Sequence, residues 1–164
     1  MSDWIVTLEA LSGAEVPLSA QEPAPLPYLQ EKNHISYDIA LSLEYKTPKM
    51  EKSDVIVTTN YKYMYWSCAQ QLAHHSVTGC NMRPGDVLGS GTISGNDKKE
   101  YGSLLELSWG GRDTIPLSSG EERKFIQDGD SVNIRGAALN NGKKIGFGEC
   151  EGTILPALPE ADYF

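Results

Sequence analysis

The strongest constraint on the fold is a strict alternation of apolar and polar residues between Ile35 and Tyr45. Isoleucine, leucine and tyrosine occupy every second position, and serine, aspartate, alanine and glutamate fill the positions between them. Side chains on a β-strand alternate between its two faces, so this pattern predicts a long strand with one buried face. A charged loop follows at 46–54, and the apolar run 55–59 predicts a second strand that pairs with the first as a hairpin.

The rest of the chain consists mainly of short strand candidates separated by turn signals. Apolar runs at 4–8 and 103–109 and a glycine-rich run at 87–95 are candidate strands, and Asn140-Asn141-Gly142 is typical of a tight hairpin turn. A Gly-Asp pair followed by a strand occurs twice, at 85–86 and 129–130, which indicates one type of turn used in two places. We therefore expect a single domain over 1–164 that is mostly β.

One segment, 61–76, has the apolar spacing of a helix instead. Asn60 is a suitable N-cap for this helix, and Gly79 is a plausible C-cap. His74 and His75 fall in the expected last turn, where the helix dipole favours positive charge. They are therefore interpreted as structural residues, and 61–76 is expected to be the one main α-helix of the fold.

Charge and cysteine content limit the classes of partner. The chain carries 14 basic and 22 acidic residues, a net charge of −8, which disfavours binding to nucleic acid or to an anionic membrane surface. No apolar run is long enough to span a bilayer. The three cysteines are widely spaced, which fits neither a disulfide framework nor a zinc site. A reduced, cytoplasmic location is therefore expected.

Two polar residues stand out from their surroundings, and the pattern leaves two interpretations open for each. Thr92 lies among the glycines of 87–95, which would let a ligand approach closely or would simply kink a strand. Glu106 has leucine on both sides. It is either a solvated carboxylate on the wet face of a strand or a partly buried carboxylate that orients a basic partner.

Several segments together resemble the fumarylacetoacetase family, in the wider fumarylacetoacetate hydrolase family. The resemblance extends from about Trp4 to Leu158, and the run from Asn60 to Gly95 is its most specific part. The segments that carry it are Asn60 to Trp66, Gln70-Gln71-Leu72, His74 to Val77, Gly79-Cys80-Asn81, Arg83-Pro84-Gly85-Asp86, Gly91 to Gly95, Gly102-Ser103, Leu105 to Trp109, Arg123-Lys124-Phe125, Asp128-Gly129-Asp130 and Ile145 to Gly148.

This resemblance implies a specific chemistry. The family hydrolyses a carbon–carbon bond of fumarylacetoacetate to give fumarate and acetoacetate, in tyrosine and phenylalanine breakdown. It implies a homodimer whose catalytic domain is a mixed β-sandwich roll. It also implies a Mg²⁺ or Ca²⁺ ion held by carboxylates, and a histidine, oriented by a glutamate, that activates water. Glu106 matches that catalytic glutamate, and Thr92 matches a threonine that contacts the substrate.

The resemblance covers only the carboxy-terminal part of the family's catalytic domain. The segments that carry the metal-binding carboxylates and the catalytic histidine have no counterpart here, so no metal ligand is assigned in this chain, and 159–164 does not match. Two hypotheses remain. The chain is part of a working hydrolase, or it is a non-catalytic truncated paralogue that acts as a binding or dimerisation module. In either case an exposed sheet surface is expected to favour association.

Overall fold

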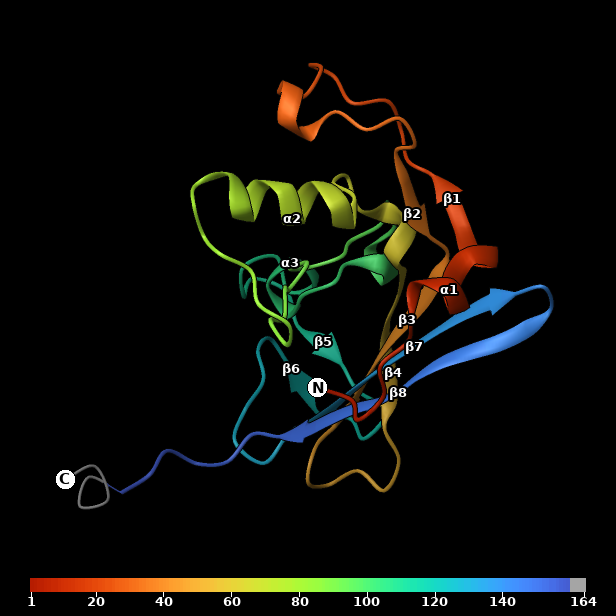
Figure 1. Cartoon of the computed structure of the whole chain (residues 1–164). Helices are drawn as coiled ribbons and strands as arrows, with labels where there is room; N and C mark the ends of the chain where they lie inside the picture. Colours follow the sequence, from red (N-terminus) through yellow and green to blue (C-terminus); the bar gives the residue numbers. More distant parts are fainter. Residues whose placement is uncertain (160–164) are drawn as a thin grey trace.

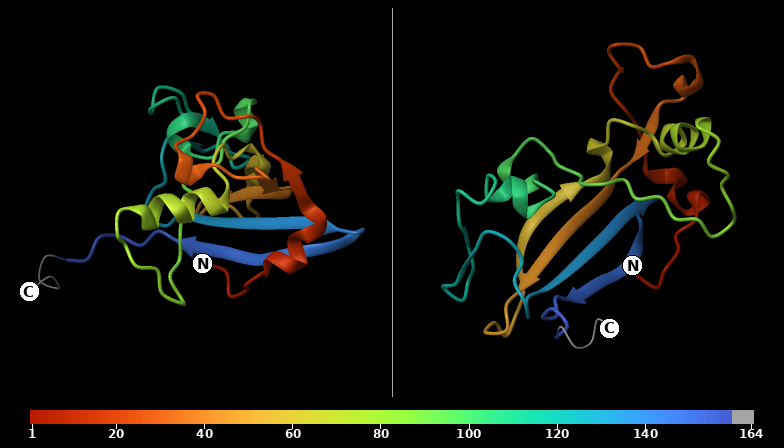
Figure 2. Two further views of the ribbon diagram at one scale, coloured as in Figure 1. Left: turned by 45° about the horizontal axis from the view of Figure 1, so that its top comes forward. Right: turned by 90° about the vertical axis from the view of Figure 1, so that its left-hand side faces the viewer.

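The computed structural model describes residues 1–159, and the tail at 160–164 lies outside the described residues. Its centre is a four-stranded antiparallel sheet in the order β4-β3-β7-β8, which Figure 2 shows side by side. The strands are β3 (Ile39–Lys46), β4 (Asp54–Asn60), β7 (Ser131–Asn140) and β8 (Lys143–Thr153). Two small antiparallel pairs accompany it: β1 (Glu15–Pro17) with β2 (Ile35–Tyr37), and β5 (Ile115–Pro116) with β6 (Glu122–Arg123). The expectation of a mostly-β fold is confirmed.

The helical elements are short and lie around this sheet (Figure 1). The α-helices are α1 (Leu8–Leu11), α2 (Cys68–Val77) and α3 (Leu104–Leu107), and the 3-10 turns are η1 (Ser12–Ala14), η2 (Pro27–Leu29), η3 (Tyr61–Tyr63) and η4 (Lys98–Glu100). Only α2 is longer than four residues, as expected for the one main helix. The proline-rich arm that carries η2 packs against α2. No helix in the described part of the chain is both long and apolar enough to cross a membrane.

The alternating segment 35–45 forms two strands rather than one. The chain leaves the small β1-β2 pair at Asp38, whose N–H donates to the carbonyl of Ala14 (2.7 Å), and enters the large sheet as β3. The alternation correctly predicted an extended chain with a buried face, since Ile39 and Tyr45 are both buried. It could not predict the change of partner strand, because side-chain alternation specifies a face and not a neighbour.

The predicted hairpin and the two predicted Gly-Asp turns are confirmed. Asn141 and Gly142 both have positive φ (49° and 77°), as the tight turn between β7 and β8 requires. In both Gly-Asp turns the glycine has positive φ, and the aspartate carboxylate accepts the backbone N–H of the first turn residue. The distance is 2.8 Å from Arg83 to Asp86 and 3.0 Å from Gln127 to Asp130.

The predicted strand at 4–8 is absent. Trp4 and Ile5 are largely exposed, and Thr7 instead caps α1 by accepting the N–H of Ala10. The N-cap at Thr7 therefore determines the local structure, and the apolar run does not, because a single short strand has no partner here to satisfy its backbone groups.

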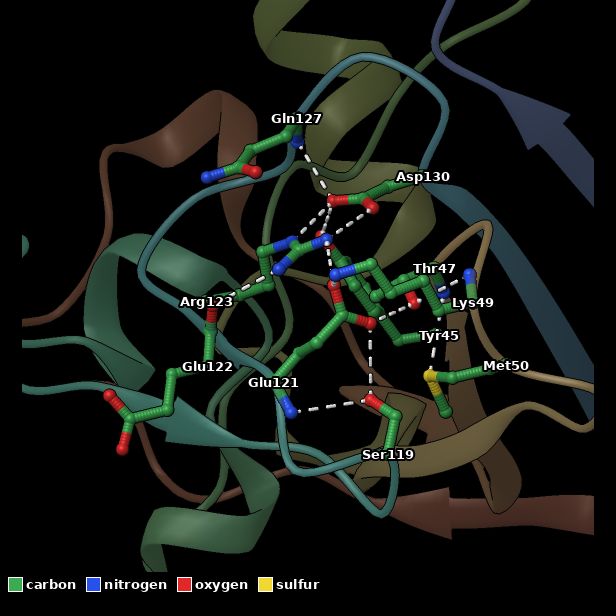
Figure 3. Close-up of polar contacts among 10 residues, drawn as sticks. All are labelled: Tyr45, Thr47, Lys49, Met50, Ser119, Glu121, Glu122, Arg123, Gln127 and Asp130. Carbon is green, nitrogen blue, oxygen red and sulfur yellow. Dashed lines mark hydrogen bonds and ion pairs between the residues drawn. The ribbon is translucent and has the colours of Figure 1, made fainter.

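A buried polar cluster joins the second Gly-Asp turn to the large sheet (Figure 3). Arg123 forms a bidentate ion pair with Asp130, with Nε 2.8 Å from Oδ2 and Nη2 3.0 Å from Oδ1. The hydroxyl of Tyr45 on β3 also donates to Asp130, and Arg123 lies 3.5 Å from Glu121, which accepts from Thr47 (2.5 Å). We call these five residues the Asp130 cluster. Every polar atom of the Asp130 side chain has a partner, although the residue is fully buried.

The chain exposes more surface to solvent than a compact monomer of its mass. The buried apolar side chains form two small clusters, one around Ile39 and Ala138 and the other around Tyr45 and Leu117. The accessible surface is 11511 Å², whereas a compact monomer of 17.9 kDa exposes about 8,000 Å². Large apolar side chains on the sheet, such as Ile134 and Leu139, are about half exposed or more. The expectation of exposed apolar sheet surface is therefore confirmed.

Candidate functional site

The candidate site is a cavity, and the segment between β4 and α2 forms one of its walls. The helix predicted over 61–76 begins later, at Cys68, because Ser67 and Gln70 form a capping box: Ser67 Oγ accepts the Gln70 N–H and Gln70 Oε1 accepts the Ser67 N–H. Asn60 does accept a backbone N–H, but the turn it caps is only η3. The later helix start leaves residues 64–66 outside the helix, where their side chains line a cavity.

The glycine-rich run 87–95 forms no strand, contrary to the prediction. Three glycines leave it without the side-chain packing that a strand needs, and Gly91 has a positive φ of 76°. Thr92 follows directly and is exposed. A close backbone approach occurs instead at Gly102, outside this run, because a Cβ on Gly102 would collide with the carbonyl oxygen of Ile93 and would lie 2.9 Å from Thr92 Cγ2.

Glu106 lies on the short helix α3 and not on the strand predicted over 103–109. Ser103 is its N-cap and accepts the N–H of Glu106 (3.2 Å), which places the Glu106 side chain in the first turn. Oε2 of Glu106 accepts hydrogen bonds from the hydroxyls of Ser94 (2.8 Å) and Ser103 (3.0 Å). Glu106 is half-buried, so the interpretation of a partly buried carboxylate describes it better than that of a fully solvated one.

Thr92 and Glu106 line one cavity of about 500 Å³. Tyr63 also lines it, and its hydroxyl donates to Glu100 (2.7 Å), which ties η3 to the loop before α3. This hydrogen bond raises the pKa of Tyr63 and lowers that of Glu100, so both groups keep their usual protonation states near neutral pH. The full lining is Tyr63, Met64, Tyr65, Trp66, Thr92, Ile93, Ser94, Ser103, Leu105 and Glu106.

His74 and His75 lie outside this cavity. His74 stacks on Tyr28 of the proline-rich arm with ring centroids 6.4 Å apart, and its Nδ1 is 3.0 Å from the Tyr28 hydroxyl. A larger, mostly apolar cavity of about 570 Å³ lies between that arm and α2, and no carboxylate lines it. Of these two cavities, the one of about 500 Å³ combines a carboxylate with several hydroxyl groups beside aromatic walls.

The described residues do not fit a divalent cation. No three histidine, cysteine, aspartate or glutamate side chains within 1–159 come close enough together to hold a metal ion. Hard cations such as Mg²⁺ and Ca²⁺ require several oxygen ligands. The Mg²⁺ or Ca²⁺ implied by the family resemblance therefore stays a prediction, and no chemical step is derived through it.

Comparison with known proteins shows the family of the chain. The family described as fumarylacetoacetate (FAA) hydrolase C-terminal matches residues 1–155. The chain belongs to the fumarylacetoacetate hydrolase family. It is 55% identical to the fumarylacetoacetase of Dictyostelium discoideum over 159 residues, 50% identical to that of Homo sapiens over 158, and 46% identical to that of Arabidopsis thaliana over 159.

The matched region is the greater part of this chain but a minor part of each family member. It covers 96% of the chain and 37% of the Dictyostelium discoideum protein, and 96% and 38% for the human protein. For the Arabidopsis thaliana protein the shares are 97% and 38%. The chain thus spans well under half the length of these fumarylacetoacetases, and it matches the C-terminal family segment, as the resemblance predicted.

Ser94 and Ser103 are site residues that the sequence pattern did not single out. Ser103 could have been found from the order Ser-x-x-Glu at 103–106, which is a known helix-start signal. Ser94 carries no such local signal, because its partner Glu106 lies twelve residues further along the chain.

Proposed function

We propose that this chain supplies an orienting carboxylate, Glu106, and a substrate-binding hydroxyl, Thr92, to a site that hydrolyses the carbon–carbon bond of fumarylacetoacetate. The products are fumarate and acetoacetate. The observation that carries the proposal is that these two side chains, from separate segments, line the same cavity. Membership of the family and the name of the matched relatives support the choice of reaction.

In this proposal Glu106 acts through a histidine base that is neither His74 nor His75. The free oxygen of Glu106 accepts the N–H of that imidazole, which fixes its tautomer and stabilises the positive charge that develops when it takes a proton from water. The resulting hydroxide adds to a carbonyl carbon of the β-diketone, and the carbon–carbon bond breaks to leave fumarate and the enolate of acetoacetate. The enolate then takes up a proton.

Thr92 contributes binding in this scheme. Its hydroxyl is exposed to the cavity and is free to donate one hydrogen bond to a substrate oxygen. Tyr65 and Trp66 provide an apolar wall against which the carbon skeleton packs. The cavity, of about 500 Å³, therefore suits a small molecule in size better than it suits a polymer.

The proposal is tested in a hybrid protein in which this chain replaces the matching segment of the Dictyostelium discoideum fumarylacetoacetase. The unaltered hybrid should release fumarate and acetoacetate from fumarylacetoacetate. Glu106→Gln should lower kcat by roughly 10²- to 10⁴-fold, because the base loses its orienting charge. Thr92→Val should raise KM by roughly 2- to 10-fold through the loss of one hydrogen bond.

Two matched variants control for the substitutions themselves. Glu122→Gln on β6 and Thr114→Val before β5 change exposed side chains outside the cavity, and both should leave kcat and KM within about twofold of the unaltered hybrid. An inactive hybrid, or a Glu106→Gln hybrid as active as the Glu122→Gln one, would contradict the proposal.

A second candidate function, a non-catalytic dimer-forming module, is favoured by the extent of open apolar surface. We propose that the chain self-associates through its sheet, since the surface in excess of a compact monomer is larger than a standard protein–protein interface. Sedimentation of the purified chain should then show a dimer. A monomer at all accessible concentrations, with sharp cooperative unfolding, would count against it.

A further inference from the structure

The two carboxylate oxygens of Glu106 differ in their partners. Oε2 accepts two hydroxyl hydrogen bonds, at 2.8 Å from Ser94 and 3.0 Å from Ser103, whereas residues 1–159 direct no hydrogen bond to Oε1. No basic side chain of the described residues forms an ion pair with this carboxylate. The two serines therefore leave one oxygen of Glu106 with its full hydrogen-bonding capacity.

Each serine is itself held in place by a backbone N–H. Ser94 Oγ accepts from Gly102 N (3.1 Å), and Ser103 Oγ accepts from Glu106 N (3.2 Å). A serine hydroxyl has only one hydrogen to donate. Because a carboxylate oxygen can only accept, the single hydrogen of each hydroxyl is donated to Glu106 Oε2.

The contact between the two serine-bearing segments depends on Gly102. A side chain at this position would collide with the backbone of Ile93 and crowd Thr92, so the close approach of the two segments requires glycine. The loop between them is closed by a backbone hydrogen bond from Gly95 N to the carbonyl of Glu100 (3.0 Å). Thr92, Ser94, Ser103 and Glu106 are thereby fixed as one unit on the wall of the cavity.

We propose that Ser94 and Ser103 are positioning residues for Glu106, which hold Oε2 with two hydroxyl donors and so reserve Oε1 for the catalytic base. This inference rests on the proposed function, in which Glu106 orients a histidine. Without the serines the carboxylate turns about its terminal torsion, which is broad and roughly two-fold, and either oxygen faces the cavity in a changing orientation. The base is then misaligned in a fraction of the molecules.

The kinetic test uses the hybrid described above. Ser94→Ala and Ser103→Ala should each lower kcat by about 10-fold, and the double variant by about 100-fold, because misplaced catalytic groups lose rate steeply. KM should stay within about twofold, since neither serine is proposed to bind substrate. Ser94→Thr and Ser103→Thr should restore most of kcat, because threonine keeps the hydroxyl and, at position 103, also serves as an N-cap.

Ser76→Ala on α2 is the matched control. It removes an exposed serine hydroxyl that donates to helix carbonyls, far in sequence from the site, and should leave kcat unchanged. Thermal unfolding of each variant separates loss of rate from loss of fold. Serine variants that raise KM as much as Thr92→Val does, or that are not rescued by threonine, would overturn the inference.

The kinetic outcomes distinguish failure of this inference from failure of the proposed function. If Glu106→Gln lowers kcat but the serine variants do not, the positioning role is wrong and the proposed function stands. If the hybrid is inactive, or if Glu106→Gln has no effect, the proposed function fails first.

A crystal structure of the Ser94→Ala/Ser103→Ala chain then decides the positioning role without any turnover. We expect the Glu106 carboxylate to leave the position that it has in the unaltered chain. An unmoved carboxylate in this double variant would contradict the inference.

Discussion

The carboxylates of Asp130 and Glu106 both accept hydrogen bonds from side chains, but they differ in their partners and in whether one oxygen stays without a partner. Asp130 is fully buried, and both of its oxygens are occupied by Arg123, Tyr45 and the backbone of Gln127. Glu106 is half-buried, and both of its hydroxyl partners bind the same oxygen. A carboxylate with every acceptor site satisfied stabilises a fold, whereas one with a free oxygen facing a cavity is available for chemistry.

The largest expected effect on stability is at Asp130. Asp130→Ala leaves the Arg123 guanidinium buried without its bidentate partner, and should lower the free energy of unfolding by about 3–5 kcal/mol in urea titrations. Glu106→Gln should change it by less than about 0.5 kcal/mol, because the amide oxygen still accepts from both serines. Equal losses of unfolding free energy for Asp130→Ala and Glu106→Gln would contradict this difference between the two carboxylates.

The stability contributed by Asp130 should depend on pH. Burial alone would raise its pKa, but hydrogen bonds from Arg123, Tyr45 and Gln127 outweigh burial and lower the pKa below the usual 3.8. A carboxylate whose pKa falls on folding contributes stability above its unfolded-state pKa and loses it as the pH drops through the folded value. The difference between the unaltered chain and Asp130→Ala should be constant above about pH 5 and shrink below about pH 4. A difference that grows on acidification would contradict this.

A smaller effect is expected at Gly102, where the site depends on a close backbone approach. Gly102→Ala should cost about 1–3 kcal/mol of stability, because the new methyl group overlaps Ile93 and crowds Thr92. In the hybrid it should also raise KM by displacing Thr92. Gly146→Ala on β8 is a suitable control, since a Cβ there meets no neighbouring atom. Equal costs at the two glycines would show that crowding is not the cause.

The smallest expected effect is at Asp86, the counterpart of Asp130 in the other Gly-Asp turn. Its carboxylate closes the turn by accepting the Arg83 N–H, but the residue is exposed and belongs to no ion pair among the described residues. Asp86→Ala should therefore cost about 0.5–1.5 kcal/mol, the value of one hydrogen bond. A loss as large as that of Asp130→Ala would mean that the turn itself, and not the buried ion pair, carries the energy.

Local sequence signals predicted the turns and several strand positions well. The Asn-Gly hairpin and both Gly-Asp turns need positive φ at particular residues, and such requirements are visible in the sequence. They do not say whether the aspartate will be buried. That difference depends on Arg123 and Tyr45, which reach Asp130 but not Asp86.

The roles of Thr92 and Glu106 stay a prediction, and the local structure around them differs from the one predicted. The sequence pattern singled out Thr92 and Glu106, the family resemblance gave them roles, and the structure places both on one cavity. The strand assigned around Glu106 was wrong because alternation over a short apolar run does not separate strand from helix. The capping signals at Ser67 and Ser103 would have corrected both helix starts. The contact between Ser94 and Glu106 is tertiary, and no local pattern predicts it.

The central claim is that Glu106 acts in fumarylacetoacetate hydrolysis and does not merely stabilise α3. The most direct measurement is kcat of the hybrid with Glu106→Gln relative to the hybrid with Glu122→Gln, at saturating substrate and with both proteins shown to be folded. We expect a ratio of roughly 10⁻² to 10⁻⁴ with no loss of stability. A ratio near one, in two equally stable proteins, would contradict the account.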